Sequence, residues 1–164
     1  MISVKNVFNN EGECLPVKTD VDFSHIAGGE ESFFQTPVRA EGMIRNRAGI
    51  VEFDYAVTFT YLAPCDRCAE PTRRDYSMQF SHILVTQLNN EDIGDFLVVE
   101  NMQLDVDELI YDDVLLNMPE KYLCKEDCQG LCSQCGANLN KGKCTCKKPV
   151  DPRLEGLLSL LDNE

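Results

Sequence analysis

The chain has 164 residues, 43% of them hydrophobic, and a formal net charge of −13. This length and apolar fraction predict one domain with a hydrophobic core and exclude global disorder. The negative charge disfavours a simple nucleic-acid coat or an anionic membrane as partner and leaves open a basic protein. Because the sequence shows neither an apolar run of membrane-spanning length nor a secretion signal, we expect a cytoplasmic protein without a membrane partner.

Alternation of apolar and polar residues predicts β-structure in the first half of the chain. Residues 51–61 place six large apolar side chains on one face: Val51, Phe53, Tyr55, Val57, Phe59 and Tyr61. Residues 37–45 and 74–85 are the preceding and following strands, which predicts an antiparallel meander with a hairpin turn at 46–49. Further strands are expected at residues 1–8, 15–23 and 96–99.

The hydrophobic period becomes helical after residue 104. Asp105 and Glu108 have the spacing of a capping box, with Asp105 as N-cap. Pro119 ends the apolar stripe that follows: Val106, Leu109, Ile110, Val114, Leu115 and Leu116.

A second helix is predicted near the C-terminus. Asp151 as N-cap and Pro152 at the first helical position precede four leucines at helical spacing: Leu154, Leu157, Leu158 and Leu161. That stripe packs on the domain or, as the alternative, lies in a partner's groove.

The expected fold class is α+β: an antiparallel sheet or partly open barrel, an acidic helix, a zinc-knuckle segment and a C-terminal helix. We divide the chain into a β-rich domain at 1–120 and a zinc-binding segment with the last helix at 121–164.

Charge is distributed unevenly along the second half. Residues 89–120 contain ten acidic residues and no Lys or Arg. In residues 121–148, six lysines oppose Glu126 and Asp127, a formal balance of +4. Two explanations fit both charged runs equally well: solvated surface, or contact with an oppositely charged partner. Candidate contacts to RNA phosphates or another partner are Arg67, Arg73, Arg74, Lys125, Lys141, Lys143, Lys147 and Lys148.

Eight of the nine cysteines form four close pairs. Zinc prefers four soft ligands in a tetrahedron, and a C-x2-C turn supplies two of them. The spacing favours one site from Cys132, Cys135, Cys144 and Cys146. It favours a second site from Cys65, Cys68, Cys124 and Cys128. The expected cofactor is therefore Zn²⁺, with two ions, and the second site joins a strand hairpin to the segment after the helix.

Other arrangements of the thiols stay open at this point. They are one zinc with spare thiols, a partition that groups Cys128 with Cys132 and Cys135, and an iron–sulfur cluster. Cys14 stands alone and is expected to be a small buried residue. Both histidines, His25 and His82, are expected to be structural or surface residues rather than ligands.

Catalytic signatures are missing from the sequence. It contains no phosphate-binding glycine loop, no G-x-S-x-G element and no HExxH element. We therefore expect no enzymatic activity, no catalytic residues and no small-molecule substrate.

The sequence Cys65-Asp-Arg-Cys68-Ala-Glu-Pro71 resembles the C-x-R-C-x-x-P element of the YceD family, which follows a β-rich half. Residues 113–119, 123–140, 144–146 and 151–154 resemble the longer, cysteine-rich branch of that family in order and spacing. Ala69 stands where a larger aliphatic residue is common, and Ser133 where proline is usual. The resemblance implies a role in accumulation of large-subunit ribosomal RNA and brings no catalytic residues with it.

The first functional hypothesis is a non-enzymatic factor of large-subunit ribosome biogenesis that contains structural zinc. Its partner is the large-subunit precursor, through ribosomal RNA, through a basic ribosomal protein, or through both. Two alternatives stay open. One is a thiol-based redox or metal sensor that loses zinc when its thiolates are oxidised. The other is a zinc-stabilised protein-interaction adaptor.

Overall fold

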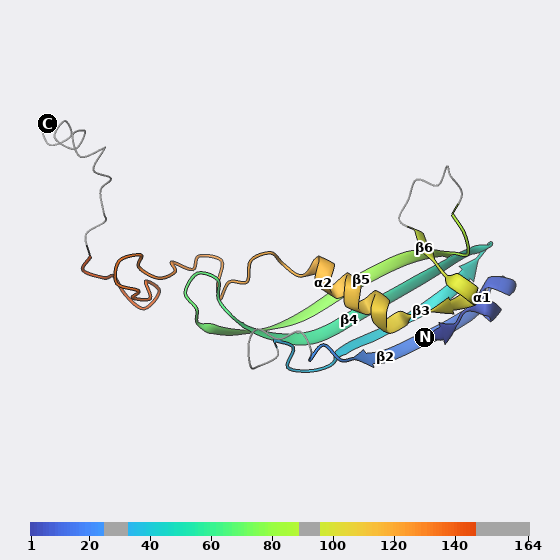
Figure 1. The fold of residues 1–164 in the computed structure, drawn as a ribbon, viewed down its shortest axis with the longest axis horizontal. Coiled ribbons are helices and arrows are strands. Elements are labelled where there is room, and N and C mark those ends of the chain that lie inside the picture. The colour runs from blue at the N-terminus through green and yellow to red at the C-terminus, as the bar shows by residue number, and fades with distance from the viewer. Residues whose placement is uncertain (25–32, 89–95, 147–164) are drawn as a thin grey trace, which may run out of the picture.

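A computed structural model describes residues 1–24, 33–88 and 96–146. The fold is mixed α+β, and its main sheet has the strand order β2-β3-β4-β5-β6 (Figure 1). These strands are β2 (Cys14–Val21), β3 (Val38–Arg47), β4 (Ile50–Pro64), β5 (Pro71–Val85) and β6 (Phe96–Val98). A two-stranded sheet pairs β1 (Ile2–Ser3) with β7 (Gln103–Leu104). The helices are α1 (Lys5–Asn9), the 3-10 turn η1 (Glu100–Met102) and α2 (Val106–Asn117).

The predicted antiparallel meander is confirmed as β3, β4 and β5. Its first turn has left-handed backbone at Ala48 and Gly49, with φ of 51° and 84°. A two-residue hairpin needs this conformation because it matches the twist of the flanking strands. The second hairpin is longer than predicted, since β4 and β5 each have 15 residues. It therefore extends well past the core.

Three details of residues 1–98 differ from the sequence predictions. β6 runs parallel to β5, so the sheet is mixed instead of wholly antiparallel. Residues 5–9 form α1 instead of a strand, because Val4 and Val7 are both buried and their spacing is that of a helical turn. Cys14 is exposed at the start of β2, so its predicted burial is wrong.

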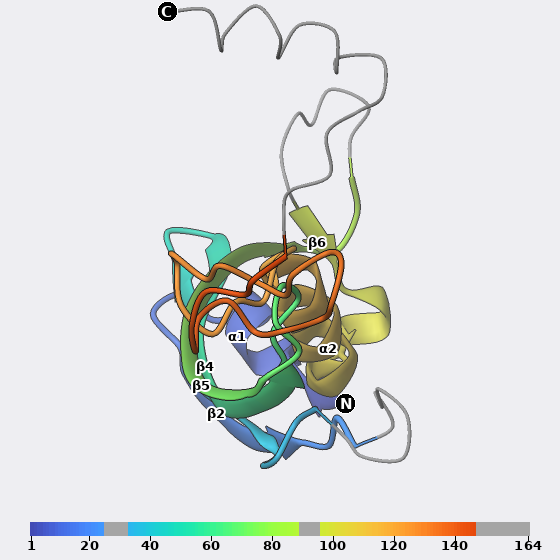
Figure 2. The same cartoon turned by 90° about the vertical axis from the view of Figure 1, so that its left-hand side faces the viewer.

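Helix α2 packs on the concave face of the sheet. Figure 2 shows the sheet curving around α1 and α2. The N-cap is confirmed, because the Asp105 side chain accepts the Glu108 N–H at 3.2 Å. Ile110 and Val114 are fully buried in the core. Leu116 is 82% exposed, so the predicted extension of the apolar stripe is wrong; it lies about 200° around the helix from Val114.

A buried polar cluster joins α2 to the sheet. The Tyr55 hydroxyl and His82 Nε2 both bond to Oδ2 of Asp113, the second at 2.6 Å. Burial and the neighbouring carboxylate raise the pKa of Tyr55, which keeps its hydroxyl protonated as a donor. Asp113 is only 9% exposed, so this member of the acidic run is a core residue and not part of a solvated surface.

Helix α2 runs toward the tip of the β4–β5 hairpin, where the following segment continues (Figure 1). This direction brings the cysteine-rich segment next to Cys65 and Cys68.

The predicted helix at 151–161 lies outside the described residues, as do His25, Lys147 and Lys148. Within the described residues, no helix is long and apolar enough to span a bilayer.

Candidate metal centre

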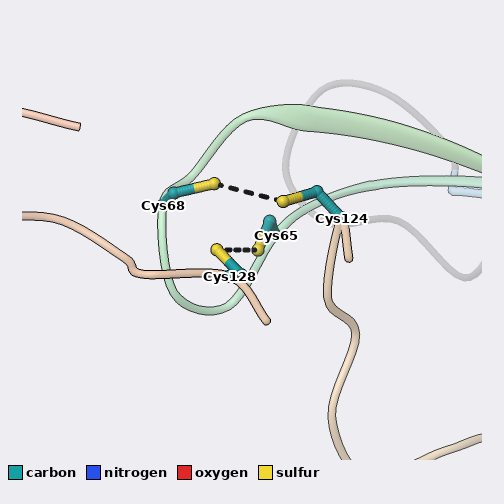
Figure 3. A group of neighbouring side chains, drawn as sticks. All are labelled: Cys65, Cys68, Cys124 and Cys128. Atoms are coloured by element: carbon teal, nitrogen blue, oxygen red, sulfur yellow. Dashed lines mark hydrogen bonds between the residues drawn. The ribbon is translucent and has the colours of Figure 1, made fainter. Parts of the chain in front are cut away.

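The tip of the β4–β5 hairpin is a tight turn that carries two thiols. Cys65 donates its N–H to the Glu70 carbonyl at 3.0 Å, and its own carbonyl accepts the Ala69 N–H at 2.8 Å. Ala69 has a φ of 58°, in the left-handed region that a non-glycine residue seldom adopts. The turn places Cys68 beside Cys65 at the end of the long hairpin (Figure 3).

The segment after α2 brings two further thiols to this tip (Figure 3). The Sγ atom of Cys128 lies 3.8 Å from that of Cys65, and the Sγ atom of Cys124 lies 3.6 Å from that of Cys68. All four sulfurs, which we name tetrad 1, lie within 4.8 Å of one another. Around a tetrahedral zinc with Zn–S bonds of about 2.3 Å, neighbouring sulfurs are about 3.8 Å apart. Tetrad 1 therefore has the spacing that a four-coordinate ion requires.

Tyr122 attaches this segment to the hairpin just before tetrad 1. Its N–H donates to Asp66 Oδ2 at 2.6 Å. Its hydroxyl donates to the Thr72 carbonyl at 2.7 Å and lies 3.2 Å from the Tyr61 carbonyl. Burial raises the pKa of Tyr122 to about 12, so the hydroxyl remains a donor at neutral pH. Tyr122 was not predicted as a site residue, because hydrogen bonds to backbone carbonyls leave no sequence pattern.

A second turn of the same design follows in the cysteine-rich segment. Cys132 donates its N–H to the Ala137 carbonyl at 2.8 Å and accepts the Gly136 N–H at 2.9 Å. Gly136 has a φ of 71° and occupies the position that Ala69 has in the hairpin tip. Glycine adopts this conformation without steric cost.

Cys144 and Cys146 complete a second group with Cys132 and Cys135, which we name tetrad 2. Its sulfurs also lie within 4.8 Å of one another, and those of Cys132 and Cys144 are 3.4 Å apart. The backbone N–H groups of Cys135 and Gln134 lower the pKa of Cys132 to about 6, which favours the thiolate that metals bind. Cys135 is exposed, whereas three thiols of tetrad 1 are buried. The two groups have the membership that spacing favoured.

Arg67 and Gly130 hold the two turns against each other. The Arg67 guanidinium donates to the Cys128 carbonyl at 2.9 Å, and the Arg67 carbonyl accepts the Leu131 N–H at 3.1 Å. A Cβ atom at Gly130 would lie 3.1 Å from that carbonyl oxygen, and Gly130 has a φ of 72°. The left-handed conformation favours glycine at this contact, and an added Cβ would fit there only tightly.

Asn140 and Lys141 add two contacts between the segment of tetrad 2 and the hairpin tip with tetrad 1. The Asn140 side chain donates to the Cys128 sulfur at 3.3 Å, and this hydrogen bond lowers the pKa of Cys128. Lys141 forms an ion pair with Glu70 at 3.1 Å. Hairpin tip, tetrad 1 and tetrad 2 thus form one connected module.

Four of the predicted RNA or partner contacts help to build this module. Arg74 donates to the Leu123 carbonyl and lies over the Tyr122 ring. Lys125 pairs with Asp127, and Arg67 and Lys141 make the contacts described above. Arg73 and Lys143 are exposed. A role of these residues in contacting RNA or another partner stays a prediction.

Removing the Tyr122 hydroxyl should weaken the attachment. We expect Tyr122→Phe to lower the free energy of unfolding by about 1 kcal/mol, because the Thr72 carbonyl loses its donor. Urea denaturation measures this effect. Tyr76→Phe is the matched control, since the Tyr76 hydroxyl is buried without a hydrogen-bond partner among the described residues. Equal effects of the two substitutions would show that the Tyr122 bonds contribute nothing.

The chain was also compared with known proteins. A sequence model of the family described as large ribosomal RNA subunit accumulation protein YceD matches residues 53–161, more than half of the chain. An uncharacterized protein of Mycobacterium tuberculosis is 30% identical over 118 residues, which cover 66% of this chain and 56% of that protein. No protein of known structure matches the chain.

Two plant proteins carry the family's name. The large ribosomal RNA subunit accumulation protein YCED homolog 1, chloroplastic, of Zea mays is 26% identical over 145 residues, covering 69% of this chain and 50% of its own. Its namesake in Arabidopsis thaliana is 25% identical over 141 residues, covering 68% and 44%. The chain thus spans about half the length of the curated relatives it matches. On the family match over residues 53–161, the chain belongs to the YceD family of large ribosomal RNA subunit accumulation proteins.

Proposed function

We propose that this protein is a non-enzymatic factor that supports accumulation of large-subunit ribosomal RNA, and that structural zinc in tetrads 1 and 2 holds its partner-binding module together. The observation that carries the proposal is the gathering of eight thiols into two groups with tetrahedral spacing, in a chain of the YceD family. The family name supports the role in ribosomal RNA accumulation, and the tetrads support the metal.

Both tetrads fit a structural ion better than a catalytic one. Each contains four cysteines, which fill the coordination shell of zinc and leave no open position for water or substrate. The sulfurs of each tetrad all lie within 4.8 Å of one another, which favours a single zinc ion over an iron–sulfur cluster, because the several iron atoms of a cluster hold their cysteine sulfurs further apart. Bound zinc would stabilise a module that has little hydrophobic core of its own.

The partner that we propose is the precursor of the large ribosomal subunit in the cytoplasm. The metal-stabilised module lies beyond one end of the sheet, where a large partner can reach it without disturbing the core (Figure 1). Exposed Arg73 and Lys143 belong to this end of the molecule. The order imposed by tetrad 1 lowers the entropy cost of binding because the module is already folded.

Sedimentation of the tagged endogenous protein in a sucrose gradient of cell lysate at moderate salt tests this proposal. We expect it to migrate with large-subunit precursors and not with mature ribosomes. Migration only as a free small protein, including when assembly is stalled, would overturn the proposal.

A second candidate, the redox sensor, draws on the exposure of tetrad 2. Cys135 is exposed to solvent, whereas Cys65, Cys68 and Cys128 of tetrad 1 are buried. Solvent-accessible thiolates are oxidised first. We therefore expect mild peroxide to release one metal equivalent from tetrad 2 before the other, as measured with a chromophoric zinc chelator.

The variant Cys135→Ser identifies the tetrad that loses its metal. It should lack the early phase of release and keep the late one. Simultaneous release of both ions would contradict the assigned order. A sensor further requires that peroxide changes sedimentation with precursors and that reduction reverses the change; unchanged sedimentation would exclude it.

A further inference from the structure

Residues of β6, the η1 turn and α2 line a groove. β6 lies toward the end of the sheet opposite the tetrads (Figure 1). The volume of the groove is about 460 Å³. Three leucines line it, Leu97, Leu104 and Leu109. Four carboxylates also line it, those of Glu100, Asp105, Glu108 and Asp112. The groove therefore combines an apolar surface with negative charge.

Three of these carboxylates are available to a partner. Glu100, Glu108 and Asp112 are exposed, and none forms an ion pair with a described residue. Asp105 differs, because it caps α2 by accepting the Glu108 N–H. No Lys or Arg occurs anywhere in residues 89–120 to neutralise this charge.

The charges and backbone conformations at the groove lower the stability of the free protein. Glu108 and Asp112 are four residues apart on α2, so two like charges lie side by side on one helix face. At the edge of the groove, Asn101 and Met102 have φ of 53° and 58°, a left-handed conformation that is unusual for methionine. Local departures from the most stable choice are typical of surfaces kept for a partner.

The apolar part of the groove is accessible as well. Leu97 and Leu109 are half-buried, and Val98 on the rim is 41% exposed. An apolar side chain of a partner can cover this surface while flanking cations reach the carboxylates. Nucleic acid fits poorly, because its phosphates would meet the same carboxylates.

We propose that this groove binds a basic amphipathic segment of a partner protein. One apolar side chain of the segment contacts Leu97 and Leu109, and its Lys or Arg side chains pair with Glu100, Glu108 and Asp112. This deepens the proposed function by naming a partner class, and it rests on that function only for the source of the segment. Basic proteins of the large subunit have this chemistry.

Binding of a fluorescent amphipathic Lys/Leu peptide to the purified full chain, followed by fluorescence anisotropy, tests the groove. The comparison probes are an all-Lys peptide of equal charge and a single-stranded RNA oligonucleotide. We expect the Lys/Leu peptide to bind most tightly and to weaken as salt rises. The triple variant Glu100→Gln, Glu108→Gln, Asp112→Asn should lose about tenfold or more in affinity.

A matched triple variant controls for net charge. Glu11→Gln, Glu13→Gln, Glu126→Gln removes the same charge from exposed positions outside the groove and should bind as the parent does. Both variants should keep the parental circular dichroism spectrum, and neither should have a lower unfolding midpoint than the parent. Equal losses of peptide affinity in the two variants would overturn the proposal that the groove binds the segment. Equal binding of the all-Lys peptide, or tighter binding of RNA, would also overturn it. Such failures would leave sedimentation with precursors unaffected, so they are distinguishable from failure of the proposed function.

Discussion

Replacing Cys68 with serine is expected to abolish metal binding at tetrad 1 and to detach the segment after α2 from the β4–β5 hairpin. Cys68 is buried, and its sulfur lies 3.6 Å from that of Cys124. A structural zinc site contributes on the order of 10 kcal/mol to folding. This is comparable with the whole stability of a domain, about 5–15 kcal/mol. Native mass spectrometry should show one metal equivalent instead of two, and thermal unfolding should begin at a lower temperature.

Cys14→Ser is the matched control for this substitution. Cys14 is exposed and belongs to neither tetrad, so both metal equivalents and the unfolding midpoint should stay at parental values. Retention of two metal ions by Cys68→Ser would contradict the assignment of tetrad 1. Loss of metal in both variants would show that the measurement does not report on the tetrads.

Replacing Asp113 with alanine is expected to lower the free energy of unfolding by about 2–4 kcal/mol. The substitution leaves the Tyr55 hydroxyl and His82 Nε2 without the oxygen that both contact, inside the core between α2 and the sheet. Stranded buried donors keep their full desolvation penalty. Urea denaturation at neutral pH measures the loss as a lower midpoint.

The neighbouring residue Asp112 provides the control for this prediction. It is exposed on the same helix, and Asp112→Ala should change the free energy of unfolding by less than about 0.5 kcal/mol. A loss at Asp113 no larger than that at Asp112 would show that the buried cluster does not stabilise the packing of α2.

The meander was predictable because period-two alternation in residues 51–61 is compatible with only one kind of element. Strand length was not, since β4 and β5 continue pairing as far as Pro64 and Pro71, beyond the residues that face the core. The parallel direction of β6 was also outside the reach of sequence patterns. A strand of three residues carries no sequence signal for its direction.

Pair spacing favoured the two groups that the structure brings together, because Cys132, Cys135, Cys144 and Cys146 are close in the chain and leave the other four thiols for a second site. Spacing alone left other partitions of the thiols open. Supporting residues such as Tyr122 and Asn140 were missed, since their bonds go to backbone atoms and to sulfur. Asp113 had a readable signal. It is three residues after Ile110 and next to Val114, on the buried stripe of α2. The prediction that the acidic run is solvated surface rested on charge alone and ignored this position.

Support of large-subunit ribosomal RNA accumulation by the metal-stabilised fold is testable in cells. The most direct measurement is the ratio of large-subunit to small-subunit ribosomal RNA in cells depleted of the protein and then supplied with the parent, Cys14→Ser or Cys68→Ser. We expect depletion to lower the ratio, the parent and Cys14→Ser to restore it, and Cys68→Ser to leave it low. An unchanged ratio after depletion, or full restoration by Cys68→Ser, would contradict this expectation.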